Sequence, residues 1–70
     1  MTLGDKIRNL RLTKGLSQKK LAELTGIPQT TISDFERNKY KPDLERLQKL
    51  ARFFEMTLDE LLSFPNDKSA

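Results

Sequence analysis

A cluster of short polar side chains in the middle of the chain is followed at once by basic residues. The segment QTTISDFERNKYKP, residues 29–42, holds amides, hydroxyls and a carboxylate before Arg37, Lys39 and Lys41. Amide and carboxylate groups suit hydrogen bonding to base edges, whereas Lys and Arg neutralise phosphates. The segment therefore has the chemistry to bind a nucleic acid, although short polar residues also solvate an exposed helix.

The rest of the composition offers little for other chemistry. The 70-residue chain contains no cysteine and no histidine, which removes disulfides, thiolate metal sites and the commonest general base. Its four serines have no histidine to activate them. We therefore expect a protein that is not an enzyme and that uses no cofactor, no metal and no small-molecule ligand.

Charge is unevenly distributed along the chain. Residues 1–54 contain twelve Lys or Arg and six Asp or Glu, whereas residues 55–70 contain one and four. A basic body favours an anionic partner, with nucleic acid as the first candidate. No apolar run approaches the roughly 20 residues that span a bilayer, and residues 1–10 lack the apolar core of a signal peptide. We therefore expect a cytoplasmic protein without a membrane partner.

Apolar residues recur at helical spacing, and no stretch alternates with the period of a strand. The apolar faces comprise Leu3, Ile7 and Leu10; Leu21 and Leu24; Ile32 and Phe35; Leu44, Leu47, Leu50, Ala51 and Phe54; and Leu58, Leu61 and Leu62. They predict an all-α fold, a compact five-helix domain over residues 1–64 with connections of two to five residues. Residues 65–70 are expected to form a frayed C-terminal tail.

Residues at the ends of these faces predict where the helices begin and end. Four polar residues are suited to cap helix starts: Thr2, Ser17, Asp43 and Thr57. Thr57 is followed three residues later by Glu60, the spacing of a capping box. Three residues suit the left-handed conformation that ends a helix: Gly15, Gly26 and Asn38.

The second and third predicted helices are joined by a turn too short for an antiparallel hairpin, so they should cross steeply. Ala22 is small enough for a close crossing, and Gly26 accepts a positive φ in the turn. Apolar residues on both sides can seal the angle: Leu21, Ile27, Ile32 and Phe35. These features together predict a helix-turn-helix motif over residues 18–37.

One face of the third predicted helix, Pro28 to Arg37, points away from the apolar side. Gln29, Thr30, Ser33, Asp34 and Arg37 fall on this outer face. Gln can bond adenine, Asp can accept from cytosine N4, and Thr can meet a thymine methyl. We therefore predict base contacts by Gln29, Thr30, Ser33 and Asp34. Alternatively, Asp34 bonds Arg37, three residues on, and only holds that side chain in place.

The segment from Ile7 to Leu62 resembles the helix-turn-helix domain of the Cro and phage-repressor type, also called the XRE family. The resemblance rests on LR in the first helix, GLSQKKLA leading into the second, GIPQTTISDFE across the turn, KP before the fourth and LDELL in the fifth. It implies a lambda-repressor-like fold that binds double-stranded DNA, usually as a homodimer on a two-fold operator. It also implies a buried ion pair between Arg11 and Glu36 and a phosphate contact by Gln18.

The sequence departs from the family pattern at three positions. Pro28 replaces the hydroxyl residue that often caps the third helix, so that cap is lost. Asn38 replaces the usual glycine, which its tolerance of the left-handed conformation allows. Asp34 places a negative charge on the predicted DNA-facing surface.

The DNA backbone is predicted to contact residues on both sides of the third helix. The predicted contacts are Ser17, Gln18, Thr31, Arg37, Asn38, Lys39, Tyr40 and Lys41. Such contacts fix the register of the protein on DNA and supply salt-dependent affinity. Lys14, Lys19 and Lys20 are interpreted mainly as solvated helix charges.

Apolar residues near the C-terminus allow two interpretations, monomer core or dimer interface. We assign Leu58 and Leu61 to the core and name Phe53, Leu62 and Phe64 as candidates for a homodimer interface.

The predicted function is that of a sequence-specific transcriptional regulator, a small dimeric repressor that inserts its third helix into the major groove. One alternative is a protein-interaction module, such as an antitoxin-like or co-regulator protein. Another is a restriction-modification controller protein. The basic residues after the third helix favour DNA over a protein partner.

Overall fold

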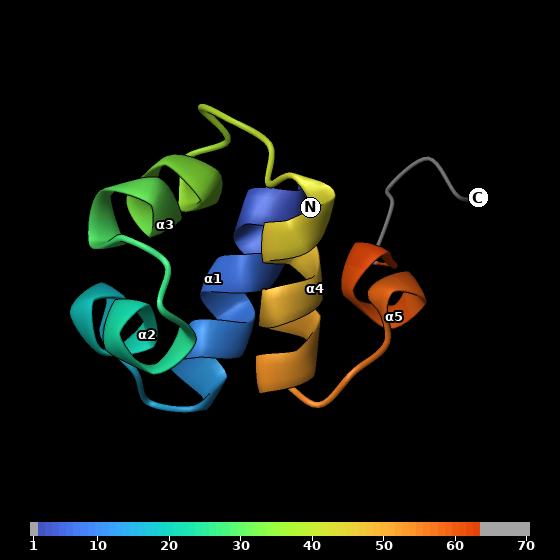
Figure 1. Ribbon diagram of the computed structural model, residues 1–70, viewed down its shortest axis with the longest axis horizontal. Coiled ribbons are helices and arrows are strands. Elements are labelled where there is room, and N and C mark those ends of the chain that lie inside the picture. The colour runs from blue at the N-terminus through green and yellow to red at the C-terminus, as the bar shows by residue number, and fades with distance from the viewer. Residues whose placement is uncertain (1, 64–70) are drawn as a thin grey trace.

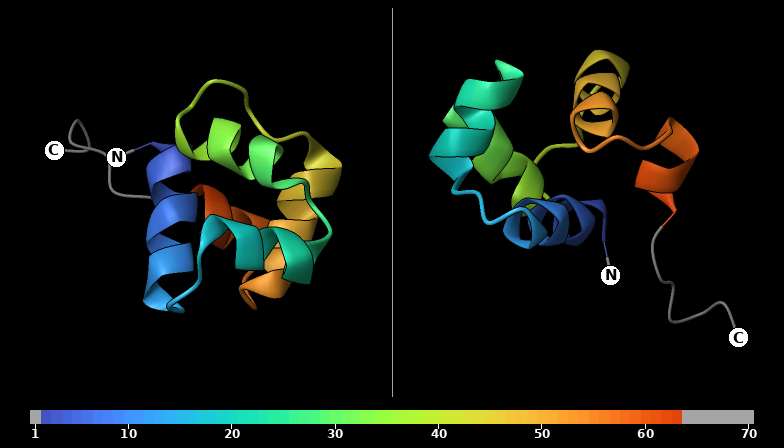
Figure 2. Two further views of the ribbon diagram at one scale, coloured as in Figure 1. Left: turned by 90° about the vertical axis from the view of Figure 1, so that its left-hand side faces the viewer. Right: turned by 90° about the horizontal axis from the view of Figure 1, so that it is seen from below.

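The computed structural model describes residues 2–63, and this part of the chain contains five α-helices and no strand. The helices are α1 (Leu3–Thr13), α2 (Gln18–Thr25), α3 (Gln29–Glu36), α4 (Leu44–Phe53) and α5 (Leu58–Leu62). The α2–α3 pair lies at one end of the long axis and α5 at the other, with α1 and α4 between them (Figures 1 and 2). The predicted all-α, five-helix fold is confirmed.

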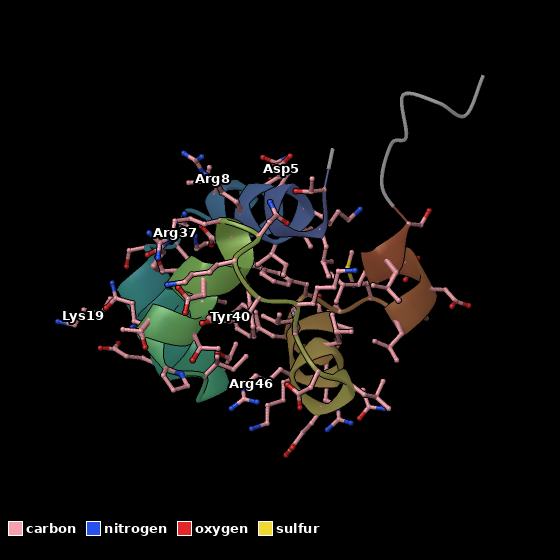
Figure 3. All side chains as sticks on the ribbon, turned by 90° about the horizontal axis from the view of Figure 1, so that it is seen from above. Asp5, Arg8, Lys19, Arg37, Tyr40 and Arg46 are labelled. Carbon is pink, nitrogen blue, oxygen red and sulfur yellow. The ribbon has the colours of Figure 1, made fainter. Side chains whose placement is uncertain are left out.

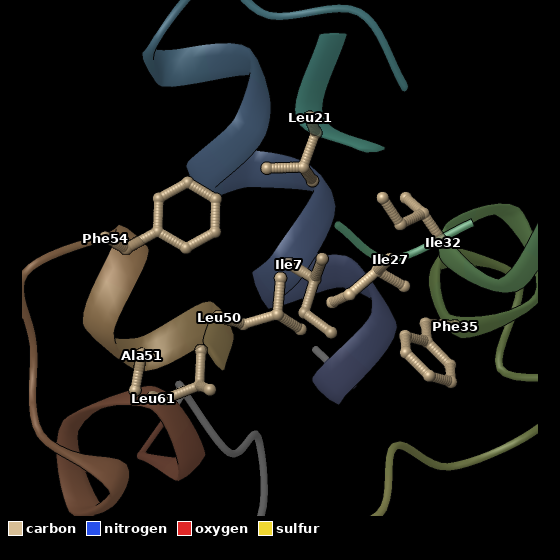
Figure 4. Close-up of a cluster of buried hydrophobic side chains, with 9 residues drawn as sticks. All are labelled: Ile7, Leu21, Ile27, Ile32, Phe35, Leu50, Ala51, Phe54 and Leu61. Carbon is tan, nitrogen blue, oxygen red and sulfur yellow. The ribbon is translucent and has the colours of Figure 1, made fainter. Parts of the chain in front are cut away.

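One hydrophobic core joins all five helices. It consists of Ile7, Leu21, Ile27, Ile32, Phe35, Leu50, Ala51, Phe54 and Leu61 (Figure 4). Three leucines that the periodicity assigned to apolar faces are exposed, since Leu24 is 50%, Leu44 is 61% and Leu62 is 46% exposed. Leu58 packs against the core from a half-buried position.

Most of the predicted helix ends are confirmed. The Thr2 hydroxyl accepts from the backbone N–H of Asp5 at 3.1 Å, and the Ser17 hydroxyl accepts from that of Lys20 at 3.0 Å. Thr57 and Glu60 form the predicted capping box. The three predicted left-handed residues adopt positive φ, 70° at Gly15, 78° at Gly26 and 60° at Asn38.

Two details of the helix ends were predicted wrongly. Asp43 occupies the N-cap position of α4, but its carboxylate accepts from Arg46 Nη1 at 2.9 Å and makes no cap hydrogen bond. The connection from α3 to α4 runs over residues 37–43, longer than predicted, because α3 ends at Glu36 and Asn38 then turns the chain out of the helix. Pro28 precedes α3 as its N-cap residue and, as expected, provides no side-chain cap.

A close contact between α1 and the end of α3 was not predicted from the sequence. A Cβ built on the buried Gly4 would lie 2.5 Å from the Phe35 carbonyl oxygen and 2.8 Å from that of Glu36. The Gly4 N–H donates to Asn38 Oδ1 at 3.1 Å, and Asn38 Nδ2 donates to the Thr2 hydroxyl at 2.9 Å. The first turn of α1 is therefore packed directly against the C-terminal end of α3.

We expect Gly4→Ala to destabilise the fold, even though alanine favours helices, because its methyl group would overlap backbone oxygens that cannot rotate away. Overpacking of this kind costs about 1–3 kcal/mol. Urea unfolding followed by circular dichroism measures the change. Asn9→Ala, at an exposed position of the same helix, is the control and should leave the midpoint nearly unchanged. Equal midpoints for the two variants would contradict the close packing at Gly4.

Candidate nucleic-acid interface

The candidate interface consists of α3, the start of α2 and residues 37–41, and it occupies the α2–α3 end of the molecule. Gln29 and Thr30 are exposed on α3, whereas Thr31, Ser33 and Asp34 are half-buried. Lys19 and Arg37 project from this end, and Arg46 projects from α4 (Figure 3). The structure thus brings the predicted base-contacting residues onto one helix, with basic residues near its C-terminal end.

A buried ion pair behind this surface joins α1 to α3. Arg11 Nε donates to Glu36 Oε2 at 2.7 Å, and Arg11 Nη2 donates to Glu36 Oε1 at 3.0 Å. Both residues are 8% exposed. The hydrogen bond to Glu36 raises the pKa of the Arg11 guanidinium above its ordinary value, while burial acts in the opposite direction. The ion pair implied by the family resemblance is therefore present.

Two further groups complete this network, and neither was predicted as part of it. Gln18 Nε2 donates to Glu36 Oε1 at 3.1 Å, and Arg11 Nη1 donates to the Leu16 carbonyl oxygen at 2.8 Å. The network therefore also fixes the chain entering α2. Glu36 uses one N–H of the Gln18 amide, so a second N–H is left for a phosphate, the contact predicted for Gln18.

Asp34 in α3 and Arg37 directly after it form an ion pair, the alternative contact that the sequence analysis gave for Asp34. Arg37 Nη2 donates to Asp34 Oδ1 at 3.0 Å, one helical turn away. The Asp34 side chain is 23% exposed, whereas that of Arg37 is 65% exposed. The carboxylate therefore lies close to the helix, and the guanidinium stands further out.

The segment after α3 presents three exposed side chains, those of Lys39, Tyr40 and Lys41. The Lys39 ammonium lies 5.7 Å from the centre of the Tyr40 ring. No ion pair involving Lys39 or Lys41 forms within residues 2–63, so both charges are available to an anionic partner. Asn38 differs from its neighbours, because its amide is bonded to Thr2 and Gly4.

The candidates for a dimer interface lie in different surroundings. Phe53 is half-buried, and its ring meets that of Phe54 edge to face at 5.1 Å between centroids. Lys14 Nζ lies 5.9 Å from the centre of the Phe53 ring. Leu62 is 46% exposed on α5. Phe64 lies outside the described residues.

Over residues 2–63 the structure shows no cluster of Asp and Glu side chains arranged to hold a metal ion. None of the five helices has the length and apolar character needed to cross a membrane.

The fold matches that of known helix-turn-helix regulators. The model of the helix-turn-helix family matches residues 7–61. The chain belongs to this family. It is 41% identical over 63 residues to the transcriptional activator BcrR of Enterococcus faecalis, which covers 90% of this chain and 31% of BcrR. The chain thus spans about a third of the length of this relative.

Two solved structures of helix-turn-helix proteins resemble this fold closely. The restriction-modification controller protein C.AhdI from Aeromonas hydrophila superposes with a TM-score of 0.78 at 36% identity, covering 84% of this chain and 89% of C.AhdI. The biofilm regulator SinR, solved in complex with DNA, gives a TM-score of 0.82 at 30% identity, covering 89% of this chain and all of the SinR chain.

We expect Glu36→Gln to destabilise the protein much more than Glu45→Gln. Removing the Glu36 charge leaves the Arg11 guanidinium buried without its counter-ion, a change that costs roughly 3–5 kcal/mol. Glu45 is exposed in the first turn of α4, where loss of a charge costs about 0–1 kcal/mol. Urea melts of the two variants provide the comparison, and coincident midpoints would show that the ion pair does not hold the fold.

Proposed function

We propose that this chain is a sequence-specific DNA-binding transcriptional regulator that places α3 in the major groove. The observation that carries the proposal is the outer surface of α3, where exposed amide and hydroxyl groups are followed by Lys39 and Lys41, which form no ion pair within residues 2–63. An eight-residue helix is about 12 Å long and enters the roughly 12 Å wide major groove.

The parts of the surface have separate roles in this proposal. Gln29, Thr30 and Ser33 meet base edges, and the backbone is held from both sides of α3. On one side Ser17, Gln18 and Thr31 donate to phosphates, and on the other side Lys39, Tyr40 and Lys41 do so. The Ser17 oxygen already caps α2, but its O–H remains free to donate.

The relatives support this function. SinR was solved in complex with DNA, and BcrR is named a transcriptional activator. We propose that this chain, acting in the cytoplasm, is a repressor, because a DNA-binding domain placed on a promoter excludes polymerase without further contacts. The likeness to C.AhdI supports a restriction-modification controller as the second candidate, which would use the same surface on DNA.

Selection of bound sites from a random double-stranded DNA pool, followed by sequencing, tests the function directly. We expect an enriched, two-fold symmetric sequence motif. Failure to enrich any sequence, together with capture of no DNA in gel shifts at low salt, would instead favour a protein-interaction module such as an antitoxin-like or co-regulator protein.

Neutralising Lys39 or Lys41 should weaken binding to all DNA sequences about equally. Each Lys→Gln variant should flatten the dependence of log K on log salt by roughly one unit, because one fewer counterion is released. Lys6→Gln is a suitable control, since the Lys6 ammonium bonds the Ser63 carbonyl oxygen at the end of α5 and is not among the predicted DNA contacts. Unchanged slopes for both variants would remove these lysines from the interface.

We propose that two copies of the chain associate through the surface around Leu62. This leucine borders a groove of about 600 Å³ whose other lining residues include Leu3, Leu47 and Pro42. An exposed leucine beside an apolar groove is a self-complementary surface, because the leucine of each copy can pack against the groove of the other. The groove is also lined by Tyr40 and Lys41, so the proposed contact between copies adjoins the segment proposed to contact the DNA backbone.

We expect Leu62→Glu to dissociate the dimer and to weaken operator binding, because it brings two carboxylates into an apolar contact. Leu44→Glu is the matched control, another exposed leucine, at the start of α4 (61% exposed against 46% for Leu62). Sedimentation equilibrium measures the change in association constant. If Leu62→Glu associates as strongly as the unmodified protein, the interface lies elsewhere.

A further inference from the structure

The ion pair between Asp34 and Arg37 has no evident role in holding the fold. Both side chains lie on the outer part of α3, and their 3.0 Å contact joins residues one turn apart in a helix that other contacts already hold. Exposed pairs at this spacing stabilise a helix by only about 0.2–0.5 kcal/mol. Asp34 also places a negative charge on the surface proposed to face DNA. This charge repels the phosphates and opposes binding unless it takes part in a specific interaction.

We propose that Asp34 and Arg37 form one reading unit, in which Asp34 positions the Arg37 guanidinium to read a guanine in the major groove. The proposal rests on the DNA-binding function proposed above. Arg37 makes the base contact, and Asp34 is a positioning residue that acts through Arg37.

The geometry suits a base edge. Arginine has five N–H donors in a planar fork, and Asp34 uses one of them. The donors that remain suit a planar pair of acceptors, and the O6 and N7 atoms of guanine form such a pair. Because the Asp34 carboxylate is half-buried against the helix and Arg37 is more exposed, the guanidinium is the group that extends towards DNA.

Charge distinguishes a guanine from a phosphate as the target. Paired with Asp34, the Arg37 guanidinium belongs to a unit of no net charge, which gains little from a phosphate and brings a carboxylate towards it. A base edge carries no net charge, so the strength of its hydrogen bonds depends on how the donors are oriented. Phosphate contacts are instead available from Lys39 and Lys41, which carry no counter-ion within residues 2–63.

This assignment replaces the backbone contact predicted for Arg37 and the cytosine contact predicted for Asp34, and it gives the alternative pairing of these two residues a role in recognition. It predicts that both residues determine the preference at the same base pair. Removing Asp34 should also release the Arg37 charge to neutralise a phosphate, which changes the salt dependence of binding.

Binding-site selection on the unmodified protein, Arg37→Ala and Asp34→Ala tests the unit. The unmodified protein should select a fixed guanine, and both variants should lose preference at that position by roughly 5- to 150-fold. On non-specific DNA, Asp34→Ala should bind more tightly with a salt slope about one unit steeper, and the double variant Asp34→Ala/Arg37→Ala should not. A purely structural role for Asp34 would produce neither change.

A modified DNA tests the guanine contact in the unmodified protein itself. Replacing the selected guanine by 7-deazaguanine, which lacks the N7 acceptor, should weaken the unmodified protein by roughly fivefold or more but leave Arg37→Ala unaffected. Asp43→Ala is the matched control, because Asp43 and Arg46 form a similar pair at 2.9 Å on α4, and it should leave every base preference intact.

The outcomes separate failure of the unit from failure of the function. If the protein selects a motif but Arg37→Ala weakens all sequences equally, Arg37 lies on a phosphate and the proposal is wrong. It is also wrong if Asp34→Ala relaxes a different base pair from Arg37→Ala. If the unmodified protein selects no motif, the DNA-reading function itself fails.

Discussion

The buried ion pair between Arg11 and Glu36 determines how the helices at the DNA-facing end are placed. Taking two charges out of water costs free energy that their attraction offsets only in part, so such a pair contributes little net stability. Its two hydrogen bonds, however, are satisfied in one relative position of α1 and α3. Glu36 also bonds Gln18, and Arg11 also bonds the Leu16 carbonyl oxygen. The network therefore fixes the start of α2 relative to α1 and α3 as well.

A second attachment holds α3 through its C-terminal end. The absence of a side chain at Gly4 allows the Phe35 and Glu36 carbonyls to approach α1, and the Asn38 amide bonds the first turn of α1. These attachments matter because α3 has only eight residues and no side-chain N-cap, and isolated helices of this length are marginal in water. The tertiary contacts therefore both stabilise α3 and set its direction.

Both attachments lie on the inner side of α3. The residues that hold this helix in place are therefore different from those proposed to contact DNA. Ile32, Phe35 and Glu36 are buried, whereas Gln29 and Thr30 make no contact that the fold requires. Substitutions at such exposed positions usually change stability by less than about 0.5 kcal/mol. The outer face of α3 can therefore differ between regulators that share this fold.

The sequence by itself determined the features that depend on neighbours within one or two helical turns. The five helices, the caps at Thr2, Ser17 and Thr57, and the positive φ of Gly26 and Asn38 all follow from local spacing and residue type. The polar face of α3 follows from helical periodicity. The Arg11–Glu36 pair was reached through the family resemblance, since nothing local joins these two residues.

Only the tertiary structure decided which surfaces meet. Gly4 and Asn38 are 34 residues apart, and Gln18 and Glu36 are 18 apart, so no local pattern indicates that they touch. Periodicity placed Leu44 on an apolar face, but whether a leucine is buried depends on the presence of another element above it. Likewise, the sequence left open whether Asp34 contacts a base or bonds Arg37. The choice between two partners for one carboxylate depends on side-chain positions, which residue spacing alone does not specify.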